Sequence, residues 1–259
     1  DRADELDLIR WQFFLEDNLS LPPEYIKALK AEFSGLFYKR FIEGAWCMAE
    51  GAIYDMLDPI RHYVPKLPDK YMDAFVALDY GTTNPLHGVY VVVALDESNP
   101  KLPVPRLYVA NELVYDSKKT GKQKTDAEYS LMVREWIATL PASPSKVFVD
   151  PSAASFIVQL YKDGVKGVTK ANNNVLDGIR STATLISNDR LMFVEPTTRI
   201  TRDEVLGYSW DSKYQDKGED KPIKMNDHGP DALRYLNMGI ITTWRHWVSA
   251  KIIGRARAM

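Results

Sequence analysis

Three acidic residues stand at the ends of predicted strands or at the start of a predicted helix. Asp79 closes the apolar run 74–78, Asp150 closes the run 146–149, and Asp231 follows a proline near the end of the chain. An ionised carboxylate at the end of a buried strand is costly to desolvate unless a cation, hydrogen-bond donors or solvent lie beside it. Three carboxylates in such positions predict a single convergent site.

The late segment Asn226-Asp227-His228-Gly229-Pro230-Asp231 supplies a histidine as well as acids. Pro230 suits the first position of a helix, which places Asp231 in the first turn, where the helix dipole favours the ionised form. Three roles are open to His228: a metal ligand, a group that orients an attacking water, or a helix cap. We expect Asp227 to be the N-terminal cap of this helix.

Carboxylates with at most one histidine suit Mg²⁺ or Mn²⁺ better than zinc or copper. Two such ions would share Asp79, with Asp150 and Asp231 on either side, and would activate a water and stabilise the leaving oxygen of a phosphodiester. Glu195, which follows the apolar run 191–194, is a further candidate. We expect Asp231→Ala to abolish cleavage. The fold should stay intact, because removal of one of several clustered acids relieves their repulsion when no metal is bound.

The elements that carry these residues change in type along the chain. Strands are expected at 74–79, 86–95 and 106–115, and the short turns between them predict an antiparallel meander. Helices and strands then alternate, which predicts parallel crossovers and a mixed sheet flanked by helices, an α/β fold. The expected order is helix 126–140, strand 147–150, helix 152–162, strand 165–169, helix 175–187, strand 191–194 and helix 199–210. One last helix is expected from about Pro230 past Trp244.

Residues 1–68 differ in pattern from the rest of the chain. Apolar spacing predicts a helix at 5–15, and Ser20 with the prolines after it predicts the start of a second helix that ends near Phe37. The prolines of 59–68 indicate a linker. The expected organisation is therefore a helical segment, 1–68, followed by a sheet domain, 69–259.

Composition and charge exclude several classes of site. The single cysteine, Cys47, excludes an internal disulfide and a cysteine-based zinc site. No apolar run approaches the roughly 18 residues of a membrane span, so we expect a soluble intracellular protein. The net charge of −2 means that nucleic-acid binding would need a local basic patch. Lys118, Lys119, Lys122 and Lys124 form one basic loop, which is either a solvated loop or a DNA contact.

The meander, the parallel additions and the positions of the acids resemble the ribonuclease H-like fold. Three stretches narrow the resemblance to the nuclease half of the large terminase subunit of tailed bacteriophages: Ala77-Leu78-Asp79-Tyr80-Gly81, Val149-Asp150-Pro151-Ser152-Ala153, and 226–235, with the sequence NDHGPDALRY. Before them, 14–18, 35–40 and 44–46 resemble the stretch that joins the terminase ATPase to its nuclease. Gly121-Lys122 lacks the other residues of a phosphate-binding loop, so no ATPase motif is expected here.

The resemblance implies a metal-dependent endonuclease that cuts concatemeric viral DNA during packaging in the host cytoplasm. The metal ligands implied are Asp79, Asp150 and Asp231, with His228 beside them, and the partners implied are double-stranded DNA, the portal protein and the small terminase subunit. Two alternatives stay open. One is another ribonuclease H-like DNA enzyme, such as a transposase, integrase or Holliday-junction resolvase, and the other is a non-catalytic module that binds the portal or DNA.

Overall fold

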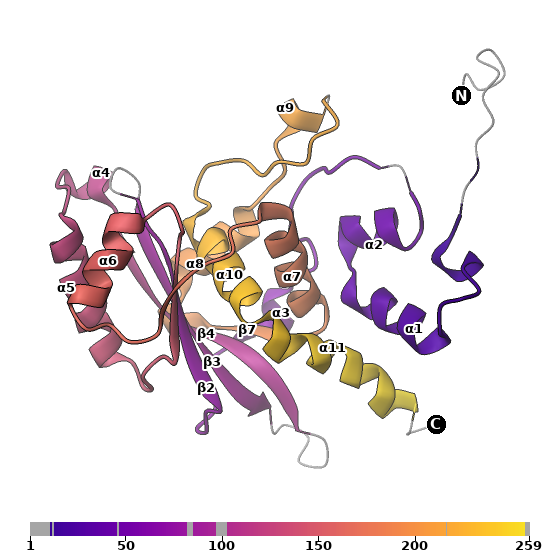
Figure 1. Cartoon of the computed structure of the whole chain (residues 1–259), viewed down its shortest axis with the longest axis horizontal. Helices are drawn as coiled ribbons and strands as arrows, with labels where there is room; N and C mark the ends of the chain where they lie inside the picture. The colour runs from indigo at the N-terminus through magenta and orange to yellow at the C-terminus, as the bar shows by residue number, and fades with distance from the viewer. Residues whose placement is uncertain are drawn as a thin grey trace.

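The computed structural model describes residues 11, 13–45, 47–81, 85–96, 103–215 and 217–256. Its centre is a seven-stranded mixed sheet with the strand order β1-β7-β4-β3-β2-β5-β6 (Figure 1). The antiparallel part consists of β2 (Asp73–Asp79), β3 (Leu86–Asp96) and β4 (Val104–Tyr115). The predicted meander is therefore confirmed.

The remaining strands are added in parallel, as the alternation of helices and strands predicts. Strand β5 (Lys146–Val149) pairs with β2, β6 (Val168–Lys170) pairs with β5, and β7 (Leu191–Val194) pairs with β4. Strand β2 thus lies between an antiparallel and a parallel neighbour. A strand that is paired on both sides is held rigidly, and Asp79 is its last residue.

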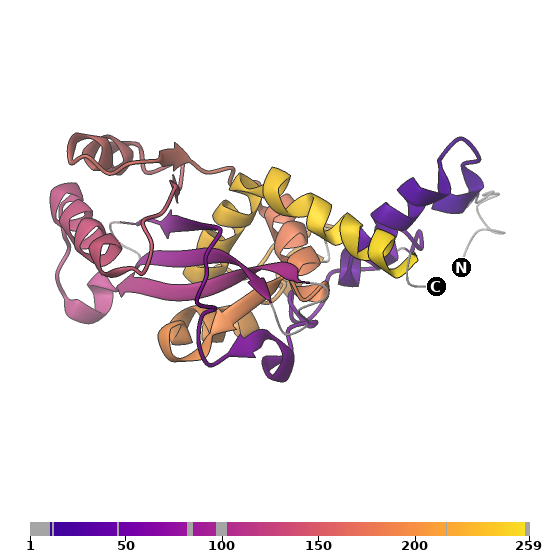
Figure 2. The same cartoon turned by 90° about the horizontal axis from the view of Figure 1, so that it is seen from below.

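Helices cover both faces of the sheet (Figures 1 and 2). Along β2, Val76 and Leu78 belong to one apolar core and Phe75 and Ala77 to the other, because successive side chains of a strand point to opposite faces. The first core is completed by α5 (Asp126–Thr139) and α6 (Ala154–Lys162), and the second by α7 (Val175–Ser187), α8 (Arg199–Gly207) and α10 (His228–Gly239). The shorter elements are α4 (Ser117–Thr120), η2 (Glu195–Thr197) and α9 (Ser212–Gln215).

The last predicted helix begins at His228, close to the expected start near Pro230, but the prediction of a single helix past Trp244 is wrong. The helix ends at Gly239, and a second helix, α11 (Ile241–Ala256), follows it. Trp244 donates a hydrogen bond from its indole nitrogen to the Asn237 carbonyl (2.7 Å), which satisfies one of the carbonyls left open by the end of α10. The apolar stripe continues across this break, so its spacing did not reveal it.

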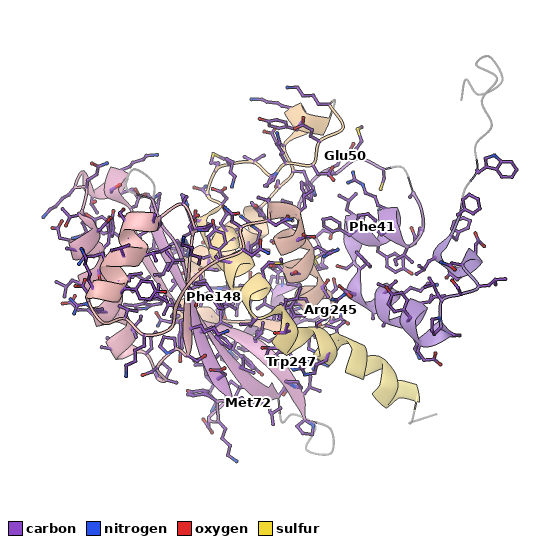
Figure 3. The ribbon with its side chains drawn as sticks, viewed as in Figure 1. Phe41, Glu50, Met72, Phe148, Arg245 and Trp247 are labelled. Carbon is purple, nitrogen blue, oxygen red and sulfur yellow. The ribbon has the colours of Figure 1, made fainter. Side chains whose placement is uncertain are left out.

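The N-terminal segment contributes η1 (Leu15–Asp17), α1 (Pro23–Glu32), α2 (Gly35–Phe41), α3 (Pro59–His62) and β1 (Tyr63–Val64). Most of the helix expected at 5–15 lies outside the described residues. Helix α1 packs beside α11, where Arg245 pairs with Glu32 at 3.0 Å (Figure 3). Strand β1 pairs with β7, so the sheet takes in residues before position 69. No helix among the described residues is both long and apolar enough to cross a membrane.

Candidate active site

A cavity of about 760 Å³ opens beside the carboxyl end of β2. Its lining includes Asp79, Asp150, Asp231 and His228, the four residues that the sequence singles out. They come from three places: the end of β2, the residue after β5, and the first turn of α10. The neighbouring parallel strands β2 and β5 end at the same edge of the sheet, and α10 begins there, which explains why the three stations meet.

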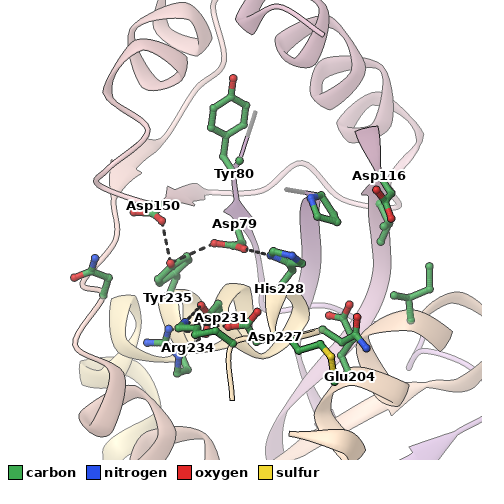
Figure 4. A pocket seen from close by; sticks show the side chains of 18 of the residues that line it. Asp79, Tyr80, Asp116, Asp150, Glu204, Asp227, His228, Asp231, Arg234 and Tyr235 are labelled. Carbon is green, nitrogen blue, oxygen red and sulfur yellow. Dashed lines mark hydrogen bonds and ion pairs between the residues drawn. The ribbon is translucent and has the colours of Figure 1, made fainter. Parts of the chain in front are cut away.

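Asp79 is nearly buried, with 8% of its surface exposed, and both of its oxygens have partners. One oxygen lies 2.8 Å from Nδ1 of His228, and the other accepts a hydrogen bond from the Tyr235 hydroxyl at 3.3 Å (Figure 4). Burial raises the pKa of the Asp79 carboxyl, and repulsion from Asp231 and Asp150 adds to the rise, although His228 opposes it. Asp231 and Asp150 are therefore close enough to disfavour the charged form of Asp79.

His228 experiences the opposite influence from the same contact. Burial alone would lower the pKa of His228, but the hydrogen bond and the charge of Asp79 outweigh burial and raise it. The raised pKa favours the imidazolium, in which Nδ1–H donates to Asp79. The contact also fixes the direction of the ring and leaves Nε2 as its second polar atom.

Asp150 shares a partner with Asp79. The Tyr235 hydroxyl lies 3.1 Å from Oδ2 of Asp150 and 3.3 Å from Oδ1 of Asp79, so one O–H spans two carboxylates (Figure 4). Burial and the three nearby acids raise the pKa of Tyr235, so the phenol stays neutral. The other oxygen of Asp150 accepts the backbone N–H of Ser152 at 2.8 Å, which fixes the carboxylate.

Asp231 is held by two cations. Its Oδ1 accepts two hydrogen bonds from Arg234, at 2.6 and 3.1 Å, and its Oδ2 lies 3.1 Å from Nζ of Lys224. Arg234 is almost fully buried, with 1% exposed. Removal of Asp231 would leave this guanidinium without its charge partner, so the expectation that Asp231→Ala leaves the fold intact is not supported by this geometry.

The two other acids considered from the sequence, Asp227 and Glu195, differ in their positions relative to the cavity. Asp227 occupies the N-cap position of α10, but its side chain accepts no capping hydrogen bond and instead lies 2.9 Å from Lys224. Asp227 is therefore the N-cap residue, as expected, but it does not cap the helix through a side-chain hydrogen bond. Glu195 is exposed at the start of η2 and does not line the cavity.

Comparisons with known proteins identify the family of the chain. The large terminase from a thermophilic bacteriophage is 40% identical to the chain, matches 93% of it and superposes with TM-scores of 0.79 and 0.80 in two crystal forms. The chain belongs to the large terminase family. It spans 57–58% of the length of these thermophilic-phage terminase chains. No protein-family model and no curated protein matched it.

A more distant likeness supports the fold of this terminase chain. The nuclease domain of the P22 large terminase is 17% identical, and the match covers 74% of this chain and 94% of that domain with a TM-score of 0.54. This likeness concerns the fold alone. The mixed sheet is the ribonuclease H-like fold expected from the sequence.

Sequence reasoning missed several residues that shape the site of this terminase chain. Glu204 of α8 accepts the Gly229 N–H at 2.6 Å, and the same oxygen lies 3.3 Å from Nδ1 of His87. Glu204 is therefore a carboxylate at the N-terminus of α10, although it lies 25 positions before Gly229. Nothing in the local pattern around Glu204 indicates this contact. Tyr235 does carry a signal, because it lies four residues after Asp231 on the same helix and so faces the same side.

The basic loop divides into two pairs. Lys118 and Lys119 lie in α4 and line the cavity. Lys122 and Lys124 are not part of its lining, and Nζ of Lys124 lies 4.9 Å from the centre of the Tyr115 ring. Gly121, with φ of +66°, is the left-handed residue that ends α4 between the two pairs.

The donor set suits a hard divalent cation, because it consists of carboxylates with one imidazole. Among the described residues, however, no three side chains of His, Cys, Asp or Glu are placed to hold one ion. The carboxylate oxygens are taken instead by His228, Tyr235, Arg234 and Lys224. A bound cation would relieve the repulsion that raises the pKa of Asp79 and would have to replace some of these protein donors.

Proposed function

We propose that this chain is a metal-dependent endonuclease that cuts concatemeric viral double-stranded DNA during genome packaging. One observation carries the proposal. Asp79, Asp150 and Asp231 reach one cavity from three elements of a ribonuclease H-like sheet, with His228 against Asp79, in a chain of the large terminase family.

Asp79, Asp150, Asp231 and His228 would hold Mg²⁺ or Mn²⁺, with two ions in the active complex. The ions would supply Lewis acidity and a nucleophilic water for hydrolysis of the phosphodiester. The side chains of the protein would place the reacting groups. His228 is aimed by Asp79, and the neutral Tyr235 hydroxyl lies between Asp79 and Asp150.

We further propose that DNA approaches past the basic loop. Lys118 and Lys119 line the same cavity as the acids, so their ammonium groups suit contact with backbone phosphates on either side of the scissile bond. Lys122 and Lys124 stand farther along the loop and would contact DNA only outside the cavity. Such contacts to the backbone carry no sequence information, which fits cutting with little sequence preference.

The remaining assignments follow from family membership and are proposals of the same kind. Residues 1–68 would link an ATPase part to the nuclease, 69–259, in a longer protein, and the thermophilic-phage terminase chains are longer than this one. Within the longer protein, the portal and the small terminase subunit would be the partners, and the host cytoplasm would be the place of action. On this division, part of the linker would belong to the nuclease sheet, because β1 pairs with β7.

Supercoiled plasmid provides the test. We would incubate it with the chain in Mn²⁺, Mg²⁺, Ca²⁺ or EDTA, and run Asp79→Asn and Asp163→Asn beside the wild type. Asp163 pairs with Ser130 and Gln159 away from the cavity, so it serves as a matched carboxylate control. Nicked and linear products are expected with Mn²⁺ or Mg²⁺ from the wild type and the control, and none from Asp79→Asn. Equal cutting by Asp79→Asn would contradict the assignment, and cutting only at branched or defined sequences would favour a resolvase or transposase.

A further inference from the structure

Lys224 contributes a cation to the acidic wall of the cavity. Its Nζ lies 2.9 Å from Oδ2 of Asp227 and 3.1 Å from Oδ2 of Asp231. The two carboxylate side chains are nearly buried, with 8% and 10% exposed, whereas the Lys224 side chain is 62% exposed. One exposed cation therefore pairs with two largely desolvated acids, of which Asp231 also pairs with Arg234.

The two oxygens of Asp231 differ in how easily they can be freed. Oδ1 is bound by Arg234, whose side chain is 2% exposed and packs against Gly178, so this partner is locked in place. Oδ2 is bound by Lys224, whose long stem can swing into solvent without a change of backbone. An incoming cation gains access to Asp231 through Oδ2, once Lys224 has moved.

The loop before Lys224 is anchored, so the position of this lysine is defined. Ile223 donates its N–H to the Ser209 carbonyl at 2.9 Å, and Trp210 forms an isolated antiparallel β-bridge with Pro222. Asp220 forms an ion pair with Arg40 of α2. These contacts hold the backbone up to 223, which places Lys224 at the mouth of the cavity.

We infer that Lys224 is a resident counter-ion of the metal-free site, which a divalent cation must displace from Asp231. The inference rests on the proposed function, because it concerns how the same acids accept metal. It also explains why, among the described residues, no three acidic or imidazole side chains are placed to hold one metal ion. A lysine lies between Asp227 and Asp231, and the tyrosine hydroxyl lies between Asp79 and Asp150.

The competition between lysine and metal can be measured without DNA and without turnover. We would titrate Mn²⁺ into the wild type, Lys224→Met, Lys224→Arg and Lys221→Met by calorimetry, and record thermal unfolding in EDTA. Lys221 lies on the same loop but pairs with Glu219, so it is the matched control. Loss of one competing charge at about 3 Å should tighten Mn²⁺ binding roughly tenfold in Lys224→Met. Lys221→Met should bind as the wild type does, and Lys224→Arg should bind no more tightly than the wild type.

Unfolding in EDTA supplies the second readout. Lys224→Met should unfold at a lower temperature than the wild type in EDTA, because Asp227 and Asp231 then repel each other, and Mn²⁺ should remove most of that difference. Suppose that the wild type binds Mn²⁺ and that Lys224→Met binds it equally well or more weakly. That result overturns the inference about Lys224 and leaves the proposed metal site standing. If neither protein binds Mn²⁺, the inference and the proposed metal site both fall.

Discussion

Nδ1 of His228 lies 2.8 Å from a carboxylate oxygen of Asp79, although 149 positions separate the two residues in the chain. The contact joins the end of β2 to the first residue of α10 and raises the pKa of the imidazole. It also means that Asp79 serves two purposes. It is the proposed central ligand, and it is the group that orients the only histidine among the described residues that line the cavity.

Asp79→Asn should separate activity from stability. Because the pKa of Asp79 is raised in the folded chain, the ionised carboxyl opposes folding, and stability falls as the pH rises through that raised pKa. The neutral amide removes this opposition, so the variant should unfold at a higher temperature than the wild type in EDTA at about pH 7. Plasmid cleavage should fall at least about 100-fold.

The pH dependence of the melting temperature serves as the control for Asp79→Asn. The gain in melting temperature should shrink as the pH is lowered toward about 4, because Asp79 is then protonated in the wild type too. A gain that is independent of pH would show that the amide acts through packing and not through charge.

Asp231→Ala should destabilise the fold. The substitution leaves the buried guanidinium of Arg234 without its carboxylate, which costs about 3 kcal/mol in the free energy of unfolding. Chemical denaturation of the metal-free protein would measure the loss. The double variant Asp231→Ala/Arg234→Met should recover part of it, because no unpaired charge then remains in the interior. If the double variant is no more stable than the single one, the loss does not come from the unpaired guanidinium.

His87 should make stability depend on pH near neutrality. This side chain is fully buried, with Nε2 2.9 Å from Oγ1 of Thr201 and Nδ1 3.3 Å from Glu204. Burial alone would lower the pKa of His87, but Glu112 and Glu204 outweigh it and raise the pKa to about 8. The imidazolium should contribute about 2 kcal/mol of stability below about pH 6.5, and this contribution should be lost as the pH rises through about 8.

Denaturation midpoints of the wild type and His87→Asn across this range would test the His87 prediction. The difference between the two proteins should shrink as the pH rises from about 6.5 to about 8.5. A constant difference would mean that His87 does not titrate over this range, which would contradict the prediction.

The two lysine pairs of the basic loop should differ in their effect on DNA binding. Lys118→Ala/Lys119→Ala should reduce the slope of log affinity against log salt by about 1 to 2, since each phosphate contact contributes about 0.9. Lys122→Ala/Lys124→Ala is the matched comparison and should reduce the slope less, because these side chains do not line the cavity. Filter binding or anisotropy in Ca²⁺ over a range of salt would measure both, and equal slopes in the first variant and the wild type would remove α4 from the DNA path.

Gly239→Ala should destabilise the junction between α10 and the sheet. A Cβ at position 239 would lie 2.3 Å from the ring of Phe148, which is inside the van der Waals contact distance. The overpacking should cost about 1 to 3 kcal/mol, and Phe148→Leu in the same chain should recover part of it. Gly207→Ala is the control, since a Cβ there meets nothing within 4 Å, and it should be neutral or slightly stabilising.

Much of the fold is encoded in short-range patterns. Apolar runs bounded by turn residues predict β2, β5 and β7 closely, and the change from meander to alternation predicts which pairs are antiparallel and which are parallel. The break at Ile240 escaped prediction, because Leu236 and Trp244 keep the apolar stripe continuous across it. Helix boundaries depend on hydrogen bonds to distant groups, which local spacing does not report.

The candidate site also has one part that the sequence predicts and another part that it does not. The sequence by itself determined that Asp79, Asp150 and Asp231 would stand where regular elements end, because the periods of strand and helix decide which residue is last or first. Only the tertiary structure decided their partners: Tyr235 between Asp79 and Asp150, Lys224 and Arg234 on Asp231, and Glu204 at the start of α10. The physical reason is range. A side-chain contact acts over a few ångströms in space. Tyr235 lies 156 and 85 positions from Asp79 and Asp150, and Glu204 lies 25 positions from Gly229, whereas Arg234 and Lys224 are near Asp231 in the chain.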